Sequence, residues 1–116
     1  MLHHVSLEVR PEDLVRFDEL LEAIGFRSVE APAELGDGVR WYAGGASQVH
    51  LILTPEASAP VLGHAAFVAP AFAETVGRLR EGGFEVEEAR QLWGARRAFV
   101  IAPGGHRLEL MADPPG

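Results

Sequence analysis

Cysteine is absent from this chain of 116 residues, as are an excess of basic charge and any long apolar run. Without cysteine there is no disulfide scaffold, thiolate zinc site or cysteine nucleophile, so a bound metal must take histidine, aspartate or glutamate ligands. The 10 basic and 17 acidic residues give a net charge of −7, whereas nucleic-acid binders carry a clustered basic surface. No window approaches the roughly 18 apolar residues of a membrane span, and the first residues lack the pattern of a signal peptide. We therefore expect a cytoplasmic protein without nucleic-acid or membrane partners.

The chain does contain an internal repeat. The segment HVSLEVRPEDLVRFDELLEAIGF resembles HAAFVAPAFAETVGRLREGGF, and the histidines that open them, His4 and His64, lie 60 positions apart. Further along, WYAGGASQVHLIL resembles VIAPGGHRLELMA, which aligns His50 with Glu109 at an offset of 59. Either similarity could arise by chance. Two similar segments that occur in the same order and at nearly the same offset favour duplication. We expect one domain over residues 1–116, with modules at about 1–55 and about 61–112.

Each module is predicted to have the order β, α, β, β, β. In the first, residues 3–9 alternate as a half-buried strand, and apolar residues then recur at helical spacing between Pro11 and a C-capping Gly25. Phe26 opens a second strand, and a hairpin turning at Gly44-Gly45 follows a loop. The second module repeats this order, with expected elements at 63–69, 71–81, 84–88, 96–102 and 107–111. The predicted fold class is α+β: a curved, cup-like mixed sheet with the helices outside.

Four side chains that can bind metals fall on one predicted face of this sheet. Successive side chains of a strand point to opposite faces, so the apolar neighbours of each candidate identify the face that packs against the helices. The candidates on the other face are His4, His50, His64 and Glu109. Three imidazoles and a carboxylate suit Zn²⁺, Ni²⁺, Mn²⁺ or Fe²⁺. Each of these histidines, taken alone, could simply be a strand residue that faces solvent, but their position on a common face favours one metal site. His3 and His106 fall on the opposite side of their strands in the alternation, so we interpret them as non-ligands.

The segments HHVSLEV, GHAAFV and AFVIAPGGHRLELM resemble signatures of the vicinal-oxygen-chelate superfamily, which includes glyoxalase I, extradiol dioxygenases, and fosfomycin- and bleomycin-resistance proteins. The resemblance covers nearly the whole chain, although the family's Asp-Pro-Asp-Gly turn reads Ala-Pro-Gly-Gly here. It places metal ligands on His4, His64 and Glu109, and a variable fourth ligand on His50. It implies a divalent-metal enzyme that acts on a small oxygen-chelating substrate, with Glu109 as the catalytic residue, in a homodimer.

The resemblance leaves several functions open. Histidine at position 50 argues against glyoxalase I, because a displaceable carboxylate in each module supplies the base of those enzymes. The segment GGHRLEL resembles the end of the fosfomycin thiol transferases, but no counterpart of their phosphonate- and potassium-binding loop is recognisable. A metal-free drug-binding protein of the bleomycin-resistance type is the main alternative. Aromatic surface for its cleft could come from Trp41, Tyr42, Trp93 and Phe99, although aromatic residues in a two-layer α+β domain are more often core. A metal site without a surviving reaction is a third possibility.

A group of arginines surrounds one of these aromatic residues. Trp93 is flanked by Arg90, Arg96 and Arg97, which suit an anionic ligand. Solvated arginines at a strand edge are the commoner arrangement. The sequence alone assigns them no role.

Overall fold

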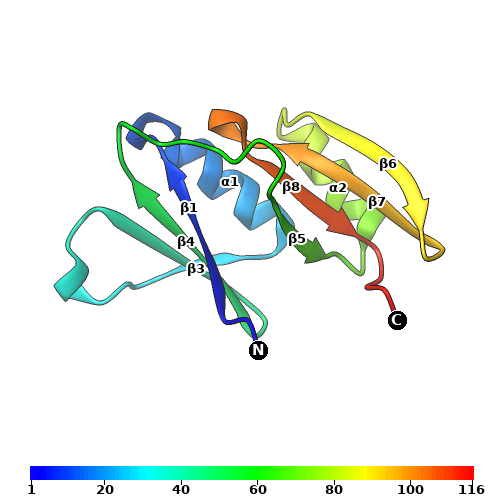
Figure 1. The fold of residues 1–116 in the computed structure, drawn as a ribbon, viewed down its shortest axis with the longest axis horizontal. Helices are drawn as coiled ribbons and strands as arrows, with labels where there is room; N and C mark the ends of the chain where they lie inside the picture. The colour runs from blue at the N-terminus through cyan, green and yellow to red at the C-terminus, as the bar shows by residue number, and fades with distance from the viewer.

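The computed structural model describes residues 1–116 as two modules with one helix and four strands each (Figure 1). Module 1 contains β1 (His4–Val9), α1 (Leu14–Ile24), β2 (Arg27–Val29), β3 (Val39–Gly44) and β4 (Ser47–Leu53). Module 2 contains β5 (Ala65–Val68), α2 (Phe72–Glu81), β6 (Val86–Leu92), β7 (Ala95–Ile101) and β8 (Arg107–Met111). Short 3₁₀ turns occupy Pro11–Asp13, Ala33–Leu35 and Pro103–Gly105. The predicted α+β class, with the βαβββ order twice, is confirmed.

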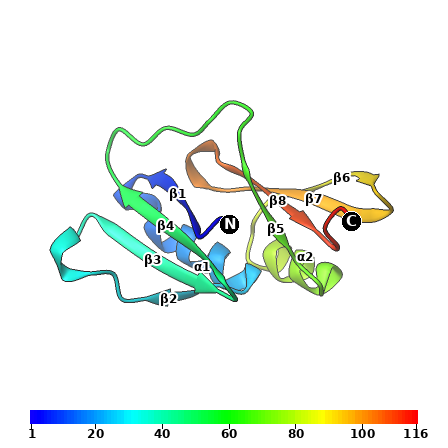
Figure 2. The same cartoon turned by 60° about the horizontal axis from the view of Figure 1, so that its bottom comes forward.

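The strands form two separate mixed sheets. Their orders are β1-β4-β3-β2 and β5-β8-β7-β6, so the two modules have the same topology. In each sheet the first pair, β1/β4 or β5/β8, is parallel and the other pairs are antiparallel. No hydrogen-bonded pairing joins β1 to β5, so the two sheets meet along an open seam. Both helices cover the same side, which leaves an open face on the other side (Figures 1 and 2).

One hydrophobic core underlies both sheets. Helix α1 ends at Gly25, whose φ of 114° is accessible to glycine and whose N–H caps carbonyls of the last turn. The helix buries Phe17, Leu20 and Leu21 completely. These side chains join a single cluster of 18 buried residues that draws on the strands of both modules, including Val49 and Leu108. The two modules are therefore packed against each other through the helix side of their sheets.

Two arginines connect the two helices, and each binds a carbonyl at the C-terminal end of the other helix. The Arg16 guanidinium of α1 donates to the Gly82 carbonyl at 3.0 Å, and that of Arg78 in α2 donates to the Ala23 carbonyl at 3.0 Å. Carbonyls of the last helical turn have no partner within the helix, so each helix satisfies one such group of the other. We call these two contacts the reciprocal arginine caps.

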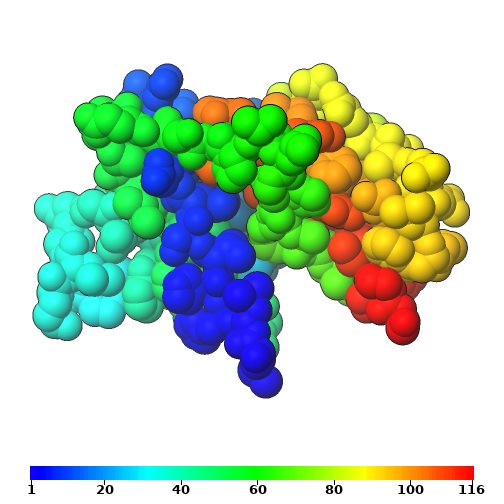
Figure 3. All heavy atoms as spheres, in the orientation of Figure 1, coloured from blue at the N-terminus to red at the C-terminus, as the bar shows by residue number.

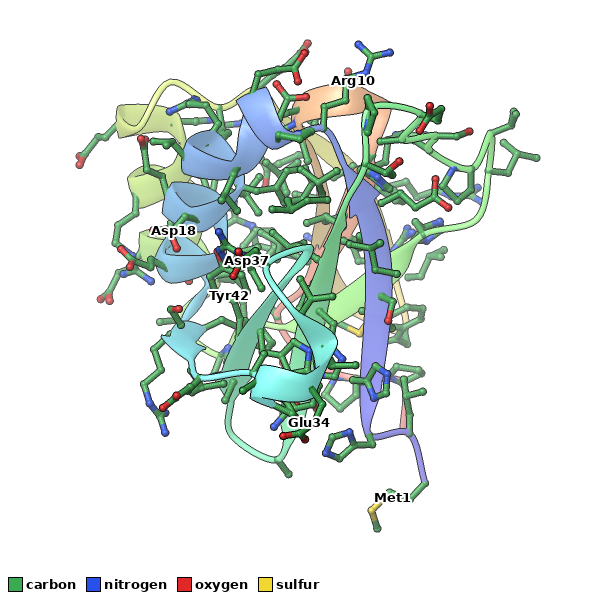
Figure 4. All side chains as sticks on the ribbon, turned by 90° about the vertical axis from the view of Figure 1, so that its left-hand side faces the viewer. Met1, Arg10, Asp18, Glu34, Asp37 and Tyr42 are labelled. Atoms are coloured by element: carbon green, nitrogen blue, oxygen red, sulfur yellow. The ribbon has the colours of Figure 1, made fainter.

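Tyr42 fixes module 1 to its own helix. Its hydroxyl donates to Asp18 Oδ1 at 2.9 Å, and Figure 4 shows the two side chains facing each other between β3 and α1. Burial, followed by the Asp18 carboxylate, raises the pKa of Tyr42, so the hydroxyl remains a donor. Tyr42 is 1 % exposed and belongs to the hydrophobic core.

The structure differs from the predicted elements mainly in the β6/β7 hairpin. Strand β6 continues to Leu92, and a two-residue turn at Trp93-Gly94 has φ values of 43° and 72°. The Trp93 indole N–H donates to the Asp113 carbonyl at 2.9 Å, which holds this unusual turn residue in place. Conversely, β5 begins at Ala65, so His64 precedes its strand.

The linker of residues 54–64 crosses from one module to the other, and the first residues project beyond the body of the molecule (Figure 3). Neither helix has the length and apolar character needed to span a membrane.

Candidate functional site

In module 2 the structure brings His64 and Glu109 together. Nε2 of His64 lies 2.9 Å from Oε1 of Glu109, and its Nδ1 lies 2.9 Å from the Leu62 carbonyl. Register places Glu109 opposite Ala66 and Phe99, while its neighbours Leu108 and Leu110 enter the core. Glu109 therefore points to the open face, as the alternation predicts. Its second oxygen, Oε2, accepts a hydrogen bond from Nε of Arg97 at 2.8 Å.

These contacts determine the charges of the pair. Both ring nitrogens of His64 face acceptors, an arrangement that only the protonated imidazolium satisfies. The Leu62 carbonyl and then Glu109 accordingly raise the pKa of His64. Burial favours the neutral acid of Glu109, but the hydrogen bonds from Arg97 and His64 outweigh it and lower the pKa of Glu109. These contacts favour a carboxylate at Glu109 between the Arg97 guanidinium and a protonated His64.

In module 1 the structure pairs His4 with His50 by stacking. The His50 ring lies between those of His4 and Trp41, with both centroid separations at 4.0 Å and interplanar angles of 19° and 3°. Nε2 of His50 lies 2.8 Å from the amide oxygen of Gln48, which leaves Nδ1 as its lone-pair nitrogen. Burial, then His4 and His3, lowers the pKa of His50, so it remains neutral.

The four sequence-predicted ligands thus form two pairs, His4/His50 and His64/Glu109. No three side chains of the kinds that bind metals gather closely enough to hold an ion. The pairs nevertheless approach each other, because His4 and His64 line one hollow of about 230 Å³ at the seam between β1 and β5. His3 borders the same hollow and contacts His4, with 3.0 Å between their Nδ1 atoms.

His106 is a structural residue of the module junction. It is buried at 5 % exposure, packs edge-on against Phe17 at 5.8 Å, and donates from Nε2 to the Glu8 carbonyl of β1 at 2.7 Å. It therefore lies on the helix side, in agreement with its strand parity.

The contact between Arg97 and Glu109 was not predicted from the sequence. The three arginines beside Trp93 looked equivalent in the sequence, but Arg96 pairs with Glu88 on the surface and only Arg97 contacts Glu109. A signal was available: Arg97 alternates with the buried Ala98 and Val100, which places it on the same face as Glu109.

Sequence comparison with models of known families gives no match, and comparison with curated proteins gives none either. Comparison with solved structures gives many. A glyoxalase family protein from Bacillus anthracis has a TM-score of 0.83 and 25% identity, over 96% of this chain and 93% of that one. A glyoxalase/dioxygenase from Nostoc punctiforme has a TM-score of 0.77 and 21% identity, over 98% and 91%. The fosfomycin resistance protein FosX from Mesorhizobium loti has a TM-score of 0.73 and 20% identity, over 98% and 92%.

This chain has the fold of glyoxalase-family proteins and FosX, which are members of the vicinal-oxygen-chelate superfamily. The predicted resemblance is therefore confirmed at the level of the fold. Solved structures of that superfamily match nearly the full length of both modules, so the duplicated architecture is common to this chain and its structural neighbours.

The donor groups of these two pairs have the chemistry that a divalent metal requires. Anchoring of Nδ1 on the Leu62 carbonyl directs Nε2 of His64 toward Glu109, and histidine ligands are commonly oriented in this way by a hydrogen bond from the other nitrogen. A metal ion would replace the proton that His64 shares with the carboxylate. His50 presents a neutral imidazole in the same manner through Gln48.

Stability of the metal-free protein should depend on pH through this pair. The raised pKa of His64 makes its contribution complete below the ordinary value of 6.5 and lost as pH rises through the folded-state pKa. The lowered pKa of Glu109 makes its contribution complete above 4.5 and lost as pH falls through the folded-state pKa. We expect His64→Ala to cost about 1 kcal/mol between these limits and less at pH 8.5, measured by urea unfolding in EDTA. In a Glu109→Gln background this pH dependence should become smaller without disappearing, because the Leu62 carbonyl still favours the imidazolium; an unchanged pH dependence would contradict the pairing.

Proposed function

We propose that this protein is a divalent-metal-dependent enzyme of the vicinal-oxygen-chelate type, acting on a small substrate that binds through adjacent oxygens. The observation that carries the proposal is the preformed pair of His64 and Glu109, with Nε2 and Oε1 2.9 Å apart on the open face. The proposed ligands are His64, Glu109 and His4, with His50 as the fourth, and the ion is Zn²⁺, Ni²⁺, Mn²⁺ or Fe²⁺.

The position of His4 supports its inclusion. It lines the same hollow as His64, and its side chain is exposed, so its ring can turn toward the pair without disturbing the core. His50 is more constrained, because Trp41 and His4 cover its two faces. In this proposal three ligands hold the ion, and His50 either completes the set or supports His4.

The bound ion would supply Lewis-acid polarisation of the substrate oxygens. The chain contributes the remaining functions: His64 and Glu109 are oriented before binding, and Glu109 is the carboxylate positioned to accept or return a substrate proton. The apolar Ala66 and Phe67 beside His64 restrict water on one side of the hollow.

A metal-free binding protein, comparable to the bleomycin-resistance proteins, is the second candidate. The column formed by Trp41, His50 and His4 is a flat stacked surface suited to a planar aromatic ligand. Both oxygens of Glu109 also have protein partners without a metal. Transfer of a thiol to fosfomycin is a third candidate function, since FosX proteins are among the structural neighbours.

We also propose a homodimer. The edges of β1 and β5 that face the seam carry no strand partner, and a second copy related by a two-fold axis is the usual way in which such surfaces are covered. Light scattering after gel filtration tests this assembly, and a monomeric mass at micromolar concentration would exclude a stable dimer.

Metal loading tests the proposed function. The full chain is incubated separately with Zn²⁺, Ni²⁺, Mn²⁺ and Fe²⁺, and bound metal is measured after removal of excess ions. We expect about one ion per chain, with affinity reduced more than about 100-fold in His64→Ala and unchanged in the surface control Arg96→Met, whose guanidinium pairs with Glu88. Thermal shifts with catechol, a 2-oxoaldehyde hemithioacetal, fosfomycin and bleomycin then sort the reactions. Wild-type protein that retains none of the four ions, but is stabilised by bleomycin, would favour the binding protein instead.

A further inference from the structure

Arg97 makes an unusual set of contacts for an arginine on an open sheet face. Its side chain is 13 % exposed, and its guanidinium connects two strands, because Nε donates to Oε2 of Glu109 at 2.8 Å and a terminal nitrogen donates to the Arg90 carbonyl at 3.0 Å. The ring centroids of Trp93 and Phe99 lie 5.7 and 5.9 Å from its guanidinium carbon. The group is therefore held at both ends and flanked on its sides.

These contacts of Arg97 restrict the orientation of the Glu109 carboxylate. A free carboxylate can turn about its last bond and offer either oxygen, or both, to an ion. Here Oε2 is fixed by Arg97, and only Oε1 faces His64. The plane of the carboxylate is thus set by a residue that does not itself contact the candidate ion.

We propose that Arg97 is a positioning residue that restricts Glu109 to one-oxygen coordination and leaves further positions on the ion open for substrate. The inference rests on the proposed metal site and goes beyond it by assigning a residue outside the ligand set. Arg97 also offsets the buried charge of Glu109 when no ion is bound, so the carboxylate keeps its orientation between turnovers.

The neighbouring arginine provides a matched control. Arg96 lies on the opposite face of β7, where it pairs with Glu88 and its guanidinium carbon lies 4.8 Å from the Phe72 ring centroid. Loss of either arginine removes one positive charge from the same strand. Only Arg97 acts on Glu109, so a difference between the two variants reports its specific contact.

The test uses titration of the full chain with Zn²⁺ and the absorption spectrum of the protein with Co²⁺. Arg97→Met should weaken Zn²⁺ binding about tenfold, because hydrogen-bonding partners of metal ligands commonly contribute tenfold or more to affinity. It should also weaken the visible Co²⁺ bands, since a freed Glu109 raises the coordination number. Arg97→Lys, which retains a donor, should restore most of the affinity, and Arg96→Met should match wild type. Urea unfolding of the four proteins verifies that each is folded.

Several outcomes would overturn the inference. Equal or tighter Zn²⁺ binding by Arg97→Met, or an unchanged Co²⁺ spectrum, would mean that Arg97 only competes with the ion for Glu109. If wild type binds ions and Arg97→Met and Arg96→Met bind Zn²⁺ with the same affinity, the assignment of Arg97 fails and the metal site stands. If wild type binds neither ion, the proposed function fails and the role of Arg97 fails with it.

Discussion

Replacement of Glu109 by alanine should lower the free energy of unfolding by about 3 kcal/mol. The carboxylate is mostly buried and holds two cationic partners, so its removal leaves Arg97 without a counter-charge at a position where only 13 % of its side chain meets solvent. The effect is large for a residue on an open face, where substitutions usually change stability by less than about 0.5 kcal/mol. Urea unfolding at pH 6 in EDTA measures it without any contribution from metal.

Two further variants separate charge from packing. Glu109→Gln keeps the shape and one acceptor, so we expect a cost of about half that of alanine. The double variant Arg97→Met with Glu109→Leu removes both buried charges and should lie within about 1 kcal/mol of wild type, because apolar pairs often replace buried ion pairs without loss. A double variant as unstable as Glu109→Ala would contradict the ion-pair explanation and indicate that packing alone matters.

The second large effect concerns the module junction. His106→Ala should cost about 3 kcal/mol, since it opens a cavity beside Phe17 and leaves the Glu8 carbonyl without its partner. Because this bond joins the start of β8 to β1, its loss weakens the coupling of the modules as well as their stability. Denaturant unfolding followed by far-UV circular dichroism and by tryptophan fluorescence measures both.

His106→Phe is the control for this variant. It keeps a ring against Phe17 but cannot donate to Glu8, so the expected cost is about 1–2 kcal/mol. Coincident unfolding curves and a wild-type midpoint for His106→Ala would show that the bond contributes nothing to the junction.

The fold could be predicted well from the sequence, because the patterns that indicate its strands and helices are local and occur in both modules. Alternation around Val49 and Leu51 places His50 away from the helices, and the structure confirms this by burying both apolar residues in the core. Gly25 marks the end of α1 through its positive φ. The hairpin at residues 86–101 was predicted too short, because charged residues such as Glu87 and Arg90 mask the alternation of strands that have one solvated face.

The site was less predictable, since its contacts are not local. Strand parity and the repeat assign His64 and Glu109 to the open face, and these two residues meet. Strand alternation indicates the face on which a side chain lies, but it does not indicate which residues that side chain contacts. The stacking of His50 between His4 and Trp41 could therefore not be predicted from the sequence, and neither could the hydrogen bond from Arg97 to Glu109. Whether the two pairs share an ion stays a prediction.

The reciprocal arginine caps influence how fast two copies could exchange modules. A chain that releases one module to a partner must first break the contacts of Arg16 with Gly82 and of Arg78 with Ala23. Because the partner offers the same residues, both contacts form again between chains once exchange is complete. The caps therefore raise the barrier to exchange and leave its equilibrium unchanged, so monomeric and exchanged forms, once separated, would interconvert slowly.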